Sequence, residues 1–315
     1  MRIIFMGTPD FASGILEAII EDRSHDVAAV VTVADKAAGR GMKIQKSSVK
    51  LCAEKYNLPV LQPEKLRDEQ FLTQLKSWNA DVFVVVAFRM LPEVVWKMPP
   101  KGTINLHASL LPQYRGAAPI NWVIINGETQ TGVSTFFINE KIDEGNILLN
   151  QGVDISSQDN AGNLHDKLLY IGKDVVLETL KQIENDAYKE QKQAHSSSLK
   201  TAPKISKEDC LIHWNLSAKQ IHNFIRGMSP YPCAFSRYKN DNGEMLPMKI
   251  FSSKMEHVNH HVSPGIIETD NKNFLRISCL DGYIYVEELQ LLGKKRLFIH
   301  DFLLGNKGFD GLFLS

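Results

Sequence analysis

Apolar residues in the first half of the chain alternate between strand-like and helix-like spacing. Residues 2–6 and 27–33 are short apolar runs, and the apolar positions of residues 11–20 recur between them at helical spacing. Residues 81–87 form a third run that is apolar almost throughout, as is typical of the centre of a parallel sheet. The alternation of strands and helices therefore predicts an α/β domain with a mostly parallel sheet.

The pattern changes in the second half of the chain. A long helical pattern at 159–183 is followed by a Ser-, Lys- and Pro-containing stretch of low apolar content, which is typical of an extended linker. One short helix at 217–227 then precedes several short strands with turns between them, which indicates a small β-barrel. We predict a catalytic domain at 1–188, a linker at 189–208 and a C-terminal barrel at 209–315.

Two polar residues share one face of a further predicted strand. Asn105 and His107 alternate with Ile104 and Leu106, and strand side chains alternate with a period of two. An amide beside an imidazole can bind a developing oxyanion and move a proton. An irregular loop follows, and strand ends of open α/β sheets are where ligands bind. We therefore favour a functional site over the alternative that the pair only caps a strand end.

Composition excludes some classes of protein. The 315 residues include 36 basic and 36 acidic ones, so the net charge gives no global sign of nucleic-acid binding and does not exclude a local basic patch. The apolar runs are too short for a signal peptide or a membrane span. The four cysteines are scattered and are interpreted as free thiols. We expect a cytoplasmic protein that is not associated with a membrane.

A metal site is not expected. His257, His260 and His261 lie in a loop-like stretch that has no cysteine or carboxylate at ligand spacing.

The stretch around Asn105 and His107 resembles a family signature. Asn-x-His followed by Ser-Leu-Leu-Pro-x-x-Arg-Gly-x-x-Pro, at residues 105–119, is similar to the signature of enzymes that use 10-formyltetrahydrofolate as formyl donor. In that family a third catalytic residue, an Asp, lies in an Asp-x-Gly turn, and Asp143-Glu144-Gly145 fits this pattern. The resemblance implies a Rossmann-like formyltransferase domain followed by an OB-like β-barrel, with Asn105, His107 and Asp143 as catalytic residues.

The resemblance also implies a folate site. The formyl donor, 10-formyltetrahydrofolate, would be bound by two segments, Phe88, Arg89, Met90, Leu91 and Ser109, Leu110, Leu111, Pro112. Many relatives have a glycine-containing segment, one residue longer, at the first of these positions. Arg89 departs from that pattern and is equally compatible with a surface charge.

A basic stretch at residues 34–50 favours a phosphate-rich partner. It contains five basic residues and one acid, and glycines flank Arg40. A solvated charged loop is the alternative, but a long basic loop beside an active site suits a nucleic acid. The tRNA-modifying members of the family carry an insertion with Ala-Gly-Arg-Gly here, which implies tRNA contacts at Arg40, Lys43 and Lys46. Lys204 and Lys207, in the linker, are equally compatible with tRNA contacts and with solvation.

The reaction implied by the resemblance is acyl transfer to the amino group of methionine esterified to initiator tRNA, by a monomer that uses no metal. Asn105 would donate to the oxyanion, His107 would relay a proton, and Asp143 would either orient His107 or accept the amine proton through water. Two alternatives stay open. One is a formyltransferase acting on a nucleotide-sugar amine or glycinamide ribonucleotide, against which the Arg40 loop and the barrel argue. The other is a non-catalytic RNA-binding protein, against which the three polar residues argue.

Overall fold

The protein, described by a computed structural model over residues 1–38, 43–240 and 242–315, divides into two compact units. Unit 1 comprises Met1–Gly116, Thr131–Val153 and His165–Thr201, and unit 2 comprises Ala117–Gln130, Asp154–Leu164 and Ala202–Ser315. The first unit thus includes part of the predicted linker, and the second includes two segments from the predicted catalytic domain. The predicted boundaries at 188 and 209 stay a prediction.

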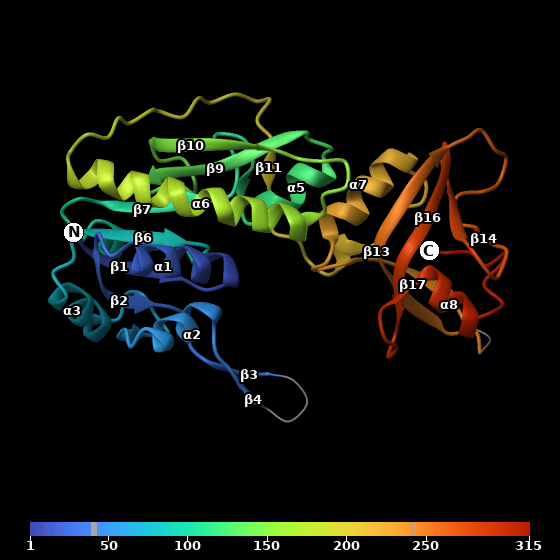
Figure 1. Cartoon of the computed structure of the whole chain (residues 1–315), viewed down its shortest axis with the longest axis horizontal. Helices are drawn as coiled ribbons and strands as arrows, with labels where there is room; N and C mark the ends of the chain where they lie inside the picture. The colour runs from blue at the N-terminus through green and yellow to red at the C-terminus, as the bar shows by residue number, and fades with distance from the viewer. Residues whose placement is uncertain (39–42, 241) are drawn as a thin grey trace. The chain divides into compact units, whose positions relative to one another are not determined.

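Unit 1 is built on a seven-stranded sheet with the strand order β10-β9-β7-β6-β1-β2-β5 (Figure 1). Its strands are β1 (Arg2–Gly7), β2 (Asp26–Val31), β5 (Val60–Leu61), β6 (Val82–Val86), β7 (Thr103–His107), β9 (Gln130–Phe137) and β10 (Ile147–Asp154). The neighbours β5, β2, β1, β6 and β7 run parallel, and β9 pairs antiparallel with β7. The prediction of an α/β domain with a mostly parallel sheet is confirmed.

Helices cover both faces of this sheet. They are α1 (Asp10–Asp22), α2 (Ser48–Lys55), α3 (Glu69–Ser77), α4 (Glu93–Trp96) and α6 (Ala161–Glu184). Outside the main sheet, β3 (Lys36–Ala38) pairs antiparallel with β4 (Lys43–Gln45). Met6 and other buried strand residues pack against Phe71 of α3 and Val95 of α4. On the opposite face α6 lies close to β7. A Cβ added to Gly172 of α6 would be only 3.2 Å from the side chain of Leu106.

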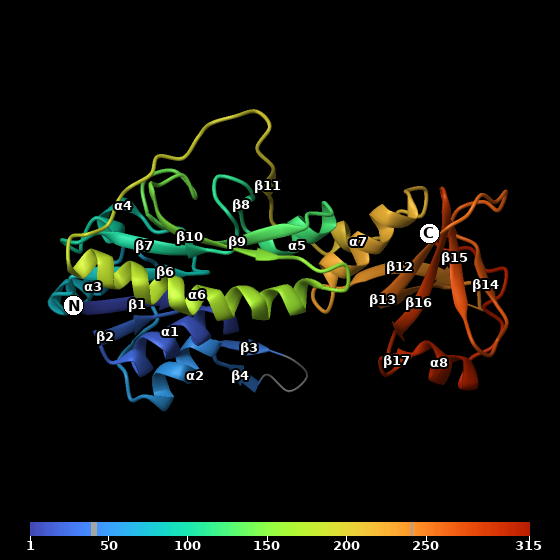
Figure 2. The same ribbon diagram turned by 45° about the horizontal axis from the view of Figure 1, so that its top comes forward.

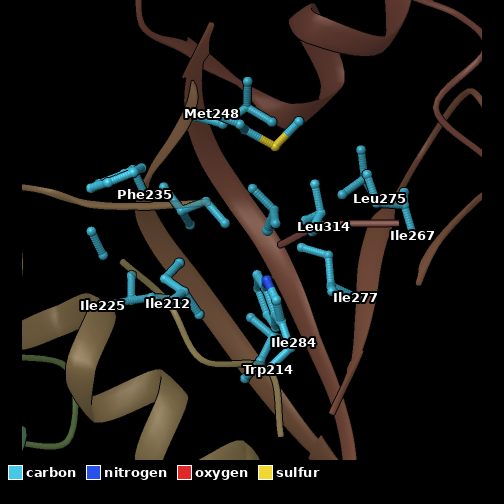
Figure 3. Packing of buried hydrophobic residues seen from close by; sticks show 14 of the residues in the cluster. Ile212, Trp214, Ile225, Phe235, Met248, Ile267, Leu275, Ile277, Ile284 and Leu314 are labelled. Carbon is cyan, nitrogen blue, oxygen red and sulfur yellow. The ribbon is translucent and has the colours of Figure 1, made fainter. Parts of the chain in front are cut away.

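Unit 2 contains a curled antiparallel sheet around an apolar core (Figure 3). Its strand order is β12 (Ala234–Lys239), β13 (Met245–His257), β16 (Gly282–Leu291), β15 (Leu275–Cys279) and β14 (Ile267–Thr269), and β17 (Leu297–Phe298) pairs with β16. The helices of the unit are α5 (Pro119–Ile125), η1 (Glu208–Cys210), α7 (Ala218–Met228) and α8 (Ile299–Gly305).

The last residues of the chain close the curled sheet. Leu314 bridges to Tyr238 of β12, and Phe313 bridges to Ile266 beside β14, so one segment joins both edges of the sheet. Register irregularities in β13 between Ile250 and Ser253 allow that long strand to bend. The last segment thus pairs with both edges of the curled sheet, as in a closed barrel. The predicted small barrel is confirmed.

Candidate active site

Strand β7 presents Asn105 and His107 on one face of the sheet. Asn105 is in register with Val85 of β6 and Phe136 of β9, and His107 is in register with Ser134 of β9. The Asn105 side chain is half-buried, and no described residue forms a hydrogen bond with its amide. The amide is therefore available to donate hydrogen bonds to a bound molecule.

Two contacts orient the His107 ring, which is 6% exposed. Its Nε2 lies 2.9 Å from the carbonyl oxygen of Tyr114. A carbonyl oxygen only accepts hydrogen bonds, so we assign the proton to Nε2, which leaves Nδ1 of the neutral ring as the basic nitrogen. Nδ1 lies 3.9 Å from Oδ2 of Asp143. The carboxylate of Asp143 is therefore the acidic group beside Nδ1.

The Asp143 turn combines a left-handed backbone conformation with a position that has no room for a side chain. Asp143 itself adopts the left-handed conformation, with φ of 53°, and its Oδ2 accepts a hydrogen bond of 2.9 Å from the backbone N–H of Gly116. Gly145 lies so close to β9 that a Cβ there would be 1.6 Å from the carbonyl oxygen of Phe137. Only glycine fits, which gives the Asp-x-Gly pattern a physical reason.

Two buried polar residues near these side chains were missed in the sequence. Gln193 is 7% exposed and donates from Nε2 to the carbonyl oxygens of Asp143 and Gly145, both at 2.8 Å. Ser134 accepts a hydrogen bond of 3.0 Å from the Leu111 N–H and donates one of 2.7 Å to the Ser109 carbonyl. Ser134 carried a weak signal, as a polar residue in an apolar strand. Gln193 lay in a polar run and carried none.

The segment Phe88–Leu91 lies at the carboxyl end of β6, next to β7. Met90 is 67% exposed and Leu91 is buried. The Arg89 guanidinium donates to the carbonyl oxygens of Pro63 and Glu64, and its burial lowers the pKa of Arg89. Arg89 therefore ties this segment to the loop after β5, and it is not a fully solvated surface charge.

The second predicted folate segment follows β7. Ser109 is fully buried and donates a hydrogen bond of 2.6 Å to the carbonyl of Gln113, and Leu111 packs against Phe136 and Ile147. Leu110 and Pro112 are half-buried. Their side chains are thus more accessible than those of Ser109 and Leu111.

The predicted tRNA contacts are distributed over both units. Arg40 lies outside the described residues, and Lys43 is the first residue of β4. Lys46 forms an ion pair of 2.8 Å with Glu54, and this contact raises the pKa of Lys46. Lys204 and Lys207 belong to unit 2 and are exposed.

Residues 1–38, 43–240 and 242–315 contain no group of three or more His, Cys, Asp or Glu side chains that could hold a metal ion. None of the helices in this part of the chain is both long and apolar enough to cross a membrane.

Comparison with known families defines the class of this protein. Residues 1–180 match a family described as formyl transferase, and residues 204–307 match the formyl transferase C-terminal domain. The fold and the site thus define a two-part formyl transferase.

Curated relatives are similar over nearly the whole chain. The methionyl-tRNA formyltransferase of Bacteroides fragilis (strain ATCC 25285) is 50% identical over 308 residues, covering 97% of this chain and 95% of the relative. That of Flavobacterium johnsoniae is 51% identical over 305 residues, covering 97% and 96%. The chain therefore belongs to the methionyl-tRNA formyltransferase family, and the resemblance stated from its motifs is confirmed.

Solved structures share the fold at lower identity. WlaRD, a sugar 3N-formyl transferase crystallised with dTDP and 5-N-formyl-THF, has a TM-score of 0.64 at 22% identity, over 94% of this chain and 99% of that one. HypX from Aquifex aeolicus, in complex with tetrahydrofolic acid, has a TM-score of 0.65 at 17% identity, over 96% of this chain and 47% of that one.

Proposed function

We propose that this protein transfers the formyl group of 10-formyltetrahydrofolate to the free amino group of methionyl initiator tRNA. One observation carries the proposal. Asn105, His107 and Asp143 lie together at the carboxyl end of β7, in a chain about half identical to methionyl-tRNA formyltransferases. Acyl transfer requires an oxyanion donor and a group that moves a proton, and these residues supply both.

The proposed roles follow from the contacts of each side chain. The methionine amine attacks the formyl carbon, so that a new N–C bond forms and the bond from that carbon to N10 of the folate breaks. Asn105, whose amide has no partner among the described residues, donates to the oxygen on which negative charge develops. His107 takes the amine proton on Nδ1 and returns a proton to the departing nitrogen.

Asp143 has two candidate roles, orientation of His107 or acceptance of the amine proton. Its Oδ2 already accepts the Gly116 N–H and lies 3.9 Å from Nδ1 of His107. This placement favours the first role, in which the carboxylate holds and stabilises the protonated imidazole.

Each substrate is proposed to bind its own set of residues. Folate would lie along Phe88–Leu91 and Ser109–Pro112, which flank β7 in the sequence and follow the carboxyl ends of β6 and β7. The tRNA would contact Arg40, Lys43, Lys46, Lys204 and Lys207 through its phosphates. Charged tRNA is a substrate of translation, so we propose that the enzyme acts in the cytoplasm. We also propose that it acts as a monomer.

Formylation of three acceptors by the purified protein tests this function. The acceptors are methionyl initiator tRNA, a nucleotide-linked amino sugar and glycinamide ribonucleotide, each with 10-formyltetrahydrofolate as donor. We expect formyl transfer to the tRNA alone, and none to methionyl-tRNA whose amine has been acetylated beforehand. Transfer to the amino sugar or to the ribonucleotide, with the tRNA left unmodified, would contradict the proposal.

A further inference from the structure

The Gln193 side chain uses all of its hydrogen-bonding capacity inside unit 1. Its two N–H groups donate to the carbonyls of Asp143 and Gly145, and its oxygen accepts from Nε and Nη2 of Arg115 at 3.0 and 2.7 Å. A side-chain amide offers two donors and two acceptor positions, so this one is fully satisfied. Buried amides of this kind hold their partners in one arrangement, because any other leaves polar groups unpaired.

The partners of Gln193 are the two parts of the site that must stay in register. On one side lies the turn that carries Asp143. On the other lies Arg115, which precedes the Gly116 N–H that binds the Asp143 carboxylate. Arg115 also forms an ion pair of 3.3 Å with Glu144 of the same turn. Gln193 therefore connects the Asp143 turn to Arg115 and the neighbouring Gly116.

The Asp143 turn needs such a restraint. A left-handed backbone at a non-glycine residue is unfavourable and persists only where the surrounding structure fixes it. Asp143 has φ of 53°, and the carbonyls on either side of Glu144 are the groups that Gln193 binds. Without these bonds the turn can relax, and the carboxylate can move away from His107.

The segment that carries Gln193 is itself fixed at two places. Gln191 exchanges two backbone hydrogen bonds of 2.9 Å with Ile147 at the start of β10, and the Lys200 carbonyl accepts one of 2.7 Å from Tyr114. Figure 2 shows the extended segment between α6 and β11 (Thr201–Ala202). At the end of this segment, β11 pairs with β8 (Arg115–Gly116). The sequence predicts a linker here, and the structure uses part of it to brace the site.

We propose that Gln193 is a positioning residue that acts on the chemical step through Asp143, an inference that rests on the proposed function. The hydrogen bonds of its side chain go to Arg115, Asp143 and Gly145, which lie outside both proposed folate segments. Its loss should therefore lower kcat and leave the KM values for both substrates nearly unchanged. A displacement of about 1 Å in a reacting group can lower a rate by roughly 100-fold. We expect a fall in kcat of about 10- to 100-fold.

Two substitutions separate positioning from bulk stability. Gln193→Met keeps the length of the side chain and removes all four hydrogen bonds. Gln193→Glu keeps the acceptor for Arg115 but loses the donors to Asp143 and Gly145, so we expect it to lose kcat as well. The control is Gln191→Met, in the same segment, where the side chain is exposed and, among the described residues, the hydrogen bonds involve the backbone alone. It should retain the wild-type kcat.

The decisive measurement is a double-mutant cycle on single-turnover formylation of methionyl-tRNA, with the folded fraction checked by thermal unfolding. If Gln193 acts through Asp143, Gln193→Met should slow the wild type but add little to Asp143→Asn. Wild-type kcat in Gln193→Met, or an equal added loss in the Asp143→Asn background, would overturn the inference. If Gln193→Met does not fold, the same cycle with Gln193→Glu decides.

A wild-type protein that leaves methionyl-tRNA unformylated would contradict the proposed function itself, and the variants separate the remaining roles. An Asp143→Asn enzyme that formylates the tRNA within a few-fold of the wild-type rate removes the role of Asp143, whatever Gln193 does. A strongly impaired Asp143→Asn enzyme beside an unaffected Gln193→Met enzyme removes only the role of Gln193.

Discussion

The proposed proton transfer uses Nδ1 of His107, because Nε2 is held by the Tyr114 carbonyl. The Tyr114 carbonyl fixes Nε2 as the protonated nitrogen, and Asp143 lies beside Nδ1. The pairing of Asn105 with His107 could be predicted, because the two share a strand face. The fixed tautomer could not, because it depends on a carbonyl in an irregular loop. Gln193 was missed for the same reason, since two of its partners are backbone carbonyls, which leave no pattern in the sequence.

A second histidine gives a prediction about stability. Burial, aided by nearby Arg226, lowers the pKa of His222 in α7 from 6.5 to about 4, and its Nδ1 contacts Ser253. The folded state thus keeps this ring neutral at pH values where the unfolded chain protonates it. Because the unfolded state binds more protons, the stability from this group is complete above pH 6.5 and is lost as the pH falls towards 4.

Urea unfolding of the wild type and of His222→Gln at pH 7 and pH 5 measures this effect. We expect the free energy of unfolding to fall more steeply between these values in the wild type than in the variant. The same pH dependence in both proteins would show that His222 is not held neutral.

At the scale of single elements, the Asp143 turn gives a sharp prediction. Gly145→Ala places a Cβ 1.6 Å from the Phe137 carbonyl, so the turn must move and Asp143 with it. We expect a lower unfolding temperature and a formylation rate reduced at least about 10-fold. Gly152→Ala in β10 is the matched control, because its nearest atom would be 3.7 Å away. Comparable losses in both variants would mean that close packing at Gly145 is not the cause.

Closure of the barrel gives another prediction at this scale. Leu314 is 1% exposed and Phe313 is 57% exposed, although both lie in the closing segment. Leu314→Ala should lower the free energy of unfolding by about 2–5 kcal/mol, because it leaves a cavity in the core. Phe313→Ala should change it by less than about 1 kcal/mol. Chemical denaturation followed by tryptophan fluorescence, with Trp214 in this core, compares them, and equal losses would contradict this account of closure.

Some elements could be predicted from the sequence, and others could not. The strands of unit 1 and helix α6 follow from apolar spacing, because each buries one face against a neighbour. The bridges that close the barrel, at Phe313 and Leu314, could not be predicted, because they pair backbones far apart in the sequence. The interpretation of residues 189–208 as a linker overlooked the pairing of Gln191 and the burial of Gln193. Low apolar content does not reveal such contacts.

At the scale of the whole molecule, a formal net charge of zero must be reconciled with binding of a polyanion. Binding would then depend on local clusters, and each phosphate contact releases counterions. We expect the affinity for tRNA to fall with rising salt. Replacing Lys204 and Lys207 by alanine should weaken binding and lower the slope of log Kd against log salt by about 1–2.

Lys97→Ala provides the control for that measurement, because Lys97 is paired with Glu93 on α4. Its removal should leave the slope unchanged. If the double lysine variant binds tRNA with the wild-type affinity and slope, Lys204 and Lys207 are solvated residues of the linker.

The proposed mechanism depends on proton transfer by His107, and single-turnover formylation of methionyl initiator tRNA by His107→Ala measures this step. Loss of a general acid–base group lowers rates by about 10²- to 10⁴-fold. We expect a loss in this range, with thermal unfolding and tRNA affinity close to those of the wild type. A folded His107→Ala protein that formylates the tRNA within a few-fold of the wild-type rate would contradict the account.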